Sequence, residues 1–190
     1  QYLLSALSLG EDLDLDISDE LRAERWRDFH GAELPRQTEP TADGREISPH
    51  DPLLPAVLAG PMALGGWVAA KASLAALAGV LAAATAWVAV RRFGVSPGVA
   101  VGVTATFALA SPLAPYGVQV YPELPAALAV TFAVAALAGP FSWRERILFL
   151  VAVVALPWLA VKYVAVAAAL VGVGAVRLWR DDERRALAVL

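Results

Sequence analysis

The feature that most constrains this chain is an abrupt change in polarity near residue 51. Thirteen of its 18 acidic side chains lie in residues 1–51. From residue 52 to residue 180 the chain is mostly Ala, Val and Leu, interrupted by a few charged residues and prolines. Apolar runs of this length are typical of helices that cross a lipid bilayer. We therefore predict an integral membrane protein with a polar N-terminal segment.

The charge distribution excludes some functional classes. Residues 1–51 carry a net charge of −8 and the remainder carries +5. No group of Lys and Arg is dense enough to indicate binding of nucleic acid. The chain has no Cys, which excludes disulfides and thiolate metal sites. Because it begins with Gln1 and lacks the profile of a signal peptide, we expect it to be a fragment of a longer membrane protein.

Turn residues divide the apolar part into predicted transmembrane helices. The clearest span, residues 67–90, contains one charged residue, Lys71. As a helix it would measure roughly 36 Å, enough to cross a hydrocarbon core of about 30 Å. The predicted spans are residues 67–90, 95–111, 122–138, 145–160 and 162–178, followed by a cytoplasmic segment at residues 181–190.

The last two spans are predicted to form a hairpin. Residues 147–176 would make a helix of roughly 45 Å, too long for one ordinary span. Pro157 interrupts the helical hydrogen bonds, and a Lys in the middle of the bilayer, as Lys162 would be, costs about 2.5–3.5 kcal/mol. A tight hairpin leaves the flanking arginines on one side of the membrane and Lys162 on the other.

The arginines then fix the predicted orientation. Arg91, Arg92, Arg144, Arg146 and Arg177 fall on one face, which the positive-inside rule makes cytoplasmic. We thus predict an all-α, polytopic transmembrane helical bundle in the plasma membrane. Residues 1–66 form an extracytoplasmic loop with interfacial helices, and residues 67–180 form the bundle.

The N-terminal segment shows local patterns of its own. Residues 2–9 have the apolar spacing of a helix on a membrane surface, and residues 13–17 alternate as a short strand does. Ser18 is a candidate N-cap for a helix that extends to about His30. Residues 53–64 are apolar but too few to span, so we expect them at the interface.

His50 and Asp51 lie where the chain enters the membrane, between Pro49 and Pro52. An imidazole and a carboxylate at this depth can bind a phosphate or a sugar hydroxyl. The alternative is structural, with His50 bonded to the backbone of a turn that the prolines make rigid. We predict that both residues bind substrate.

The second group of polar residues precedes a span, in the string Gln119-Val120-Tyr121-Pro122-Glu123. Glu123 is either an ordinary acid at a helix N-terminus or a functional carboxylate at membrane depth. We predict that Glu123 is catalytic and that Gln119 and Tyr121 bind substrate. Lys162 either snorkels to the interface or neutralises a phosphate, and we predict that it binds substrate.

The acidic string of Asp12, Asp14 and Asp16 is similar to a metal-ligand run in spacing only. It lacks the Gly and the bidentate Glu that a calcium loop requires. We interpret it as a solvated acidic surface and predict no protein ligands for a metal, so a divalent cation is left open as a cofactor.

Several short strings, in their order along the chain, resemble bacterial polytopic glycosyltransferases of the GT-C superfamily, such as protein mannosyltransferases and aminoarabinose transferases. They are QYLLSALSL at residues 1–9, DLDLDIS at 12–18, ISPHDPLLPAVLAGPMALGG at 47–66, YPELPAAL at 121–128 and PWLAVKY at 157–163. The resemblance implies transfer of a sugar from a polyprenyl-phosphate donor to an acceptor outside the cytoplasm. Besides the donor, the implied partners are membrane lipid and the remaining N- and C-terminal parts of the parent protein.

The resemblance also implies roles for residues. The main catalytic acid of the family precedes the segment that matches residues 2–4, so no residue of this chain takes its place. Glu123 corresponds to a second acidic residue, His50 to a polar contact and Lys162 to a partner of the lipid phosphate. Two other hypotheses are a transporter or flippase subunit for a lipid-linked sugar, and an inactive truncated membrane protein.

Overall fold

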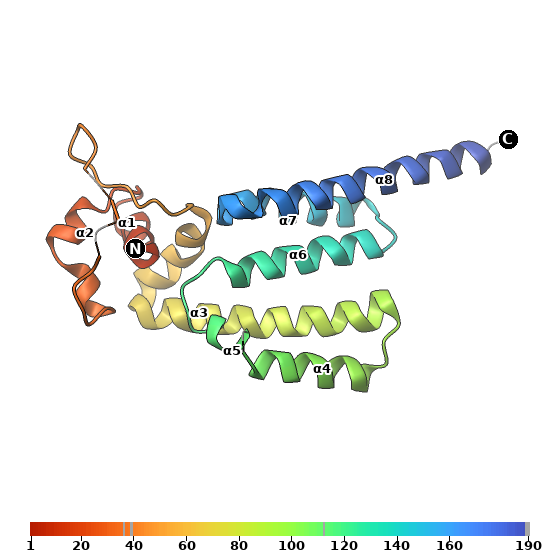
Figure 1. The fold of residues 1–190 in the computed structure, drawn as a ribbon, viewed down its shortest axis with the longest axis horizontal. Coiled ribbons are helices and arrows are strands. Elements are labelled where there is room, and N and C mark those ends of the chain that lie inside the picture. Colours follow the sequence, from red (N-terminus) through yellow and green to blue (C-terminus); the bar gives the residue numbers. More distant parts are fainter. Residues whose placement is uncertain (36, 39, 112, 189–190) are drawn as a thin grey trace. The chain divides into compact units, whose positions relative to one another are not determined.

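The structure, a computed structural model, describes residues 1–35, 37–38, 40–111 and 113–188, and its regular elements are all helices (Figure 1). Its helices are α1 (Tyr2–Glu11), α2 (Ser18–Arg22), α3 (Leu53–Phe93), α4 (Pro97–Leu109), α5 (Leu113–Tyr116), α6 (Glu123–Ala138), α7 (Trp143–Leu159) and α8 (Val164–Ala188), with 3-10 turns η1 (Arg25–Asp28) and η2 (Val161–Tyr163). Within these residues the only β pairing is an isolated antiparallel bridge between Asp16 and Ile47. The predicted all-α class is confirmed for the described part of the chain.

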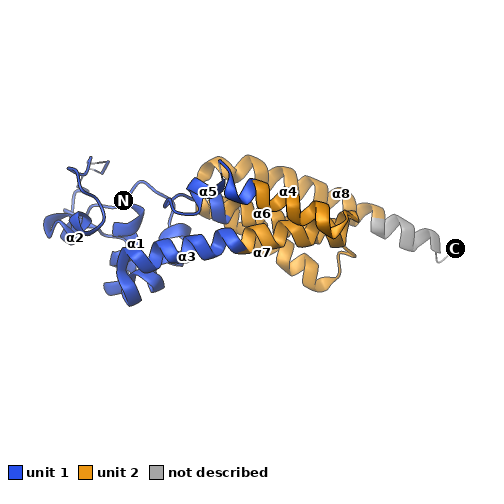
Figure 2. Cartoon of the chain, turned by 90° about the horizontal axis from the view of Figure 1, so that it is seen from below, with its two compact units in different colours: residues 1–79, 107–125 blue, residues 80–106, 126–190 orange. Residues whose placement is uncertain are grey.

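The chain forms two compact units, coloured separately in Figure 2. Unit 1 comprises Gln1–Gly79 and Phe107–Pro125, and unit 2 comprises Val80–Thr106 and Ala126–Leu190. This division by compactness differs from the predicted division by polarity at residue 66, because α3 contributes to both units. Of the predicted cytoplasmic segment 181–190, residues 189–190 lie outside the described residues.

Unit 1 is built around α1 and the first part of α3. Leu4, Leu54 and Leu58 are completely buried, and burial of each such side chain contributes about 1.5–3 kcal/mol. A Cβ on Gly10 would lie 3.0 Å from the backbone oxygen of Ala59, so α1 and α3 pack closely at this glycine. The structure differs from the expected surface helix, because six consecutive residues of α1, from Leu3 to Ser8, are buried within unit 1.

The predicted helix from Ser18 to His30 is wrong in its extent. It stops at Arg22, because Glu24 adopts a left-handed conformation (φ 53°, ψ 33°), and only the short turn η1 follows. Ser18 is also not the N-cap: it is the first helical residue, and its hydroxyl donates a hydrogen bond to the Asp16 carboxylate instead.

Two glycines break α3 near its first third. Gly65 (φ −156°, ψ 23°) and Gly66 (φ 61°, ψ −159°) depart from helical geometry. The conformation of Gly66 is one that residues with a Cβ rarely adopt. The apolar residues 53–64 are therefore a helical segment of their own, separate from the longer segment that follows.

Two helical stretches are long and apolar enough to cross a membrane, Leu53–Phe93 and Val161–Arg180, with mean hydropathies of 2.0 and 1.7. Of the 18 most apolar consecutive residues in each stretch, only 17% and 11% are buried inside the protein. The core helix of a water-soluble domain would be mostly buried, so this exposure favours association with a membrane. The helices α4 and α6 are apolar as well but shorter.

Unit 2 contains α7 and α8, which pack against each other. A Cβ on Gly174 of α8 would lie 3.0 Å from the ring of Phe149 of α7. The two helices are separated by an extended residue, Ala160 (φ −166°, ψ 139°), and by η2, three residues after Pro157. Proline within the last turn of α7 favours this break because it removes a backbone donor.

Arginines gather around the loop between α6 and α7. The side chain of Arg92 forms an ion pair with Glu145, whose other oxygen accepts a hydrogen bond of 2.8 Å from the Ser142 N–H. Arg146 Nε donates to the Phe141 carbonyl at 3.0 Å, and Arg177 donates to the Gly139 carbonyl. Cations from α3, α7 and α8 thus meet at one end of unit 2.

Candidate functional site

Five of the six predicted site residues belong to unit 1. His50 and Asp51 form part of the turn before α3, Gln119 and Tyr121 lie between α5 and α6, and Glu123 is the first residue of α6. The sixth, Lys162, belongs to unit 2. It is exposed, and its Nζ lies 5.3 Å from the ring centroid of Tyr163.

The imidazole of His50 stacks on the ring of Tyr2. The two ring centroids are 4.2 Å apart and the ring planes differ by 14°. Burial lowers the pKa of His50 below its usual value, while the neighbouring charge of Asp51 acts in the opposite direction. His50 is therefore a neutral imidazole near pH 7, and it connects the start of α1 to the turn before α3.

A cavity of about 150 Å³ lies next to this stack in unit 1. Its lining comes from α1, from the loop after η1 and from the segment before α6: Gln1, Tyr2, Leu3, Phe29, His30, Leu34 and Val120. Both polar atoms of the Gln1 amide are buried and have no hydrogen-bond partner within the described residues. The volume is below the roughly 300–1,000 Å³ of typical ligand pockets and suits a group the size of a phosphate or part of a sugar ring.

His30 was not predicted as a site residue. It lines this cavity and also a wider hollow of about 460 Å³ together with Glu24, Trp26, Arg27, Gly31, Ala32 and Glu33. Its ring makes an edge contact with Trp26, with centroids 6.5 Å apart. The available signal was that both histidines of the chain fall in the polar N-terminal segment.

The three predicted site residues before and at the start of α6 differ in their burial. The Oε2 atom of Glu123 is buried, whereas Gln119 and Tyr121 are exposed. The Tyr121 ring contacts the Tyr116 ring edge-on at 6.4 Å. None of these three predicted residues lines the cavity, but Val120, in the same segment, does. The function of these three residues therefore stays a prediction.

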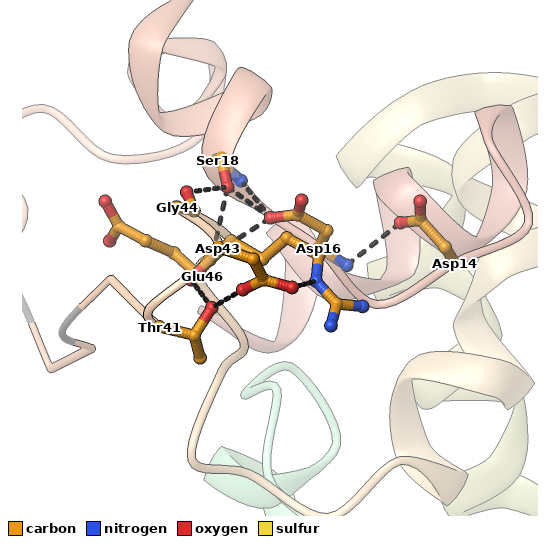
Figure 3. Close-up of polar contacts among 8 residues, drawn as sticks. Asp14, Asp16, Ser18, Thr41, Asp43, Gly44 and Glu46 are labelled. Carbon is orange, nitrogen blue, oxygen red and sulfur yellow. Dashed lines mark hydrogen bonds and ion pairs between the residues drawn. The ribbon is translucent and has the colours of Figure 1, made fainter.

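Figure 3 shows that two residues of the acidic string are engaged in hydrogen bonds. Asp14 Oδ1 accepts bonds from Ser8 Oγ (2.8 Å) and the Asp16 N–H (2.9 Å). Asp16 Oδ1 accepts from the N–H groups of Ser18 (3.1 Å) and Glu46 (3.0 Å). The Ser18 hydroxyl and these N–H groups hold the pKa of Asp16 below its usual value. This network attaches residues 41–46 to residues 14–18.

The third member of the string, Asp12, lies elsewhere. Its carboxylate groups with those of Asp19 and Glu20, one oxygen of each lying within 4.8 Å of the others. Glu20 is only 2% exposed, and burial, with added repulsion from Asp19 and Asp12, raises its pKa to about 8. The nearby N–H of its own backbone partly offsets this shift, but neither this N–H nor the Asp19 side chain meets the geometry of a hydrogen bond to the Glu20 carboxylate oxygens, which have no other such partner within the described residues.

Unit 2 has an apolar groove of about 480 Å³. It is lined by Val80, Ala83, Ala84, Trp87, Arg92, Phe132, Ala135, Ala136, Glu145 and Leu148. The Arg92–Glu145 ion pair is the only charged part of this lining, and no predicted site residue belongs to it.

Comparison with models of protein families, with curated proteins and with solved structures gave no match. The fold class, the cavity and the carboxylate cluster are thus observations on this chain alone. The resemblance to the GT-C glycosyltransferases rests on the short strings quoted above.

Proposed function

We propose that this chain is part of a polytopic membrane glycosyltransferase that takes a sugar from a polyprenyl-phosphate donor. The observation that carries the proposal is the cavity of unit 1, which is lined by the start of one string that resembles the GT-C family and by Val120, directly before a second such string. The start of α1 and the segment before α6 line it, and the His50 turn stacks on one of its lining residues, Tyr2. The strings at residues 47–66 and 121–128 contain the starts of the apolar helices α3 and α6.

The chemistry of such a transfer suits these residues. The bond between the anomeric carbon and the phosphate oxygen breaks, a glycosidic bond forms to the acceptor hydroxyl, and polyprenyl phosphate leaves. In our proposal the Glu123 carboxylate takes the proton of the acceptor hydroxyl. Neutral His50, with Gln119 and Tyr121, donates hydrogen bonds to sugar or phosphate oxygens, and the role of Lys162, which belongs to unit 2, stays a prediction.

The proposed topology places residues 1–66 outside the cytoplasm. It is supported by the arginines that gather around the loop between α6 and α7, since clustered cations favour the cytoplasmic side. Lipid-linked sugar donors present their phosphate at the membrane surface, the depth at which the proposed α3 and α6 spans begin.

The test is sugar transfer in nanodiscs from a panel of polyprenyl-phosphate sugars, with the parent protein that contains this chain. We expect Glu123→Gln to lower kcat by about 10²-fold or more, the usual contribution of a general base. Asp28→Asn, which neutralises an exposed carboxylate of the same unit, should leave kcat unchanged. Equal activity of the two variants would remove Glu123 from the catalytic role, and absence of transfer from every donor would refute the proposed function.

A further inference from the structure

We propose that Asp12, Asp19 and Glu20 form a binding site for a hard divalent cation such as Ca²⁺, Mg²⁺ or Mn²⁺. One carboxylate oxygen from each residue lies within 4.8 Å of the other two. Ligand oxygens around one such cation stand 2.0–2.6 Å from it, so separations of about 3–5 Å between them are those of a shared ion. The inference does not depend on sugar transfer.

The burial of Glu20 is the second observation that points to a ligand. Glu20 as a whole residue is 98% removed from solvent, and neither carboxylate oxygen accepts a hydrogen bond within the described residues. Burial of a charged carboxylate without a partner is costly, so such a group keeps its proton, as the raised pKa of Glu20 shows, unless it is paired or bound to a metal. A cation among the three carboxylates supplies that partner and removes their mutual repulsion.

The local fold holds the cluster in place. Asp12 caps the C-terminus of α1, with its N–H bonded to the Ser8 carbonyl at 2.8 Å. Asp19 and Glu20 lie in α2, and the intervening residues are held by the hydrogen bonds of Asp14 and Asp16 (Figure 3). The ligands are therefore carried by a connected piece of structure, which lowers the entropy cost of binding an ion.

The nearest arginines along the chain have other acceptors. Arg25 donates two hydrogen bonds to Glu11, at 3.0 and 3.2 Å, although it lies close enough to Glu20 for their charges to interact. Arg22 Nε donates to the Ser18 carbonyl at 3.1 Å. Within the described residues no ion pair involves Asp12, Asp19 or Glu20. The three carboxyl groups are thus left for an ion to bind, and a bound cation would favour release of the Glu20 proton.

The donor set selects the class of metal. Three carboxylates without His or Cys suit oxygen-seeking cations rather than Zn²⁺ or Cu²⁺. Asp12 and Asp19 are exposed, so water can complete the coordination.

Titration of the purified 190-residue chain in detergent micelles with Mn²⁺ tests the proposal. Bound Mn²⁺ loses its free-ion electron paramagnetic resonance signal, and Ca²⁺ or Mg²⁺ should restore that signal by competition. We expect one saturable site, and a loss of affinity of about tenfold or more in Glu20→Gln and in Asp19→Asn, because affinity follows the charge of the ligands. Asp28→Asn, outside the cluster, should bind like the unsubstituted chain.

A folding control separates loss of the site from loss of structure. In EDTA, Glu20→Gln should melt at the same temperature as the unsubstituted chain or higher, since the amide has the size of the protonated carboxyl group and carries no repulsion toward Asp12 and Asp19. Should Glu20→Gln fail to fold, Asp19→Asn decides, because Asp19 is exposed. No saturable binding at millimolar Mn²⁺, or equal affinity of Asp19→Asn and Asp28→Asn, would overturn the proposal.

Discussion

The ring of His50 lies parallel to the ring of Tyr2, 4.2 Å away, and this pair connects α1 to the turn that leads into α3. His50 therefore has a structural role whether or not it also contacts a substrate. The two roles make different demands on the side chain, because stacking requires a flat ring and substrate binding requires a ring nitrogen.

We expect His50→Ala to lower the free energy of unfolding of the chain by about 0.5–1.5 kcal/mol, the value of an aromatic pair. His50→Phe keeps a ring and should retain most of that stability. The measurement is unfolding in mixed micelles followed by circular dichroism. If His50→Phe is as unstable as His50→Ala, the imidazole nitrogens matter more than the stack.

The ion pair between Arg92 and Glu145 gives a second prediction. Their side chains are 19% and 14% exposed. Loss of one partner of a fully buried pair costs about 3–5 kcal/mol, so for this less buried pair we expect Arg92→Ala to cost about 1–3 kcal/mol. Arg144→Ala removes an exposed arginine that takes no part in the ion pair, so it serves as the control and should change stability by less than about 0.5 kcal/mol. The same unfolding assay compares them.

The hydrogen bonds to Asp16 predict a dependence on pH. Because the pKa of Asp16 is lowered in the folded state, its contribution is complete above the unfolded pKa of about 3.9. It is lost as the pH falls below that value through the folded pKa. Between about pH 5 and pH 3 the unsubstituted chain should therefore lose more stability than the Asp16→Asn variant, because the variant has no carboxylate to protonate at this position. Equal losses in the two proteins would contradict the assigned network.

The break in α3 can be tested by placing a methyl group on it. Gly66→Ala should destabilise the chain by about 1–3 kcal/mol, because φ is 61° at this position. Gly79→Ala, in the same helix with open space around the new methyl group, should be neutral or stabilising by up to about 1 kcal/mol. Thermal melting of both variants in one detergent measures the difference. A neutral or stabilising effect of Gly66→Ala would mean that the break is dispensable.

The proposed topology can be mapped by single-cysteine labelling, since the chain has no Cys of its own. Ala42 and Ser96 are exposed and lie before α3 and before α4. A membrane-impermeant maleimide should label Ala42→Cys in intact cells, and Ser96→Cys only after permeabilisation. The reverse pattern would invert the proposed orientation and place the cavity in the cytoplasm.

The helices of the apolar part end close to residues that can be recognised in the sequence. α3 ends at Phe93 beside Gly94, α6 ends at Ala138 before Gly139, and the chain turns between α7 and α8 shortly after Pro157. Glycine and proline act locally, through permitted φ angles and the missing N–H, so their effect does not depend on the rest of the fold.

The polar segment was harder to predict because its structure depends on contacts between distant residues. The capping rule predicted Ser18 as the N-cap of α2. In the structure its hydroxyl donates a hydrogen bond to the Asp16 carboxylate instead, and the Glu46 N–H donates to both side chains. Asp12 was grouped with Asp14 by spacing, whereas the fold brings it to Asp19 and Glu20. The position of His30 at the cavity likewise depends on α1, which precedes it by many residues.

The break at Gly66 has a consequence for work in lipid. The helical segment after it, residues 67–93, measures about 40 Å at 1.5 Å per residue, whereas a typical hydrocarbon core is about 30 Å thick. In the proposed bilayer the helix accommodates this mismatch by tilting, and its tilt from the membrane normal is larger in a thinner membrane. Acyl-chain length is therefore an experimental variable for this protein, to be matched between nanodisc preparations before their properties are compared.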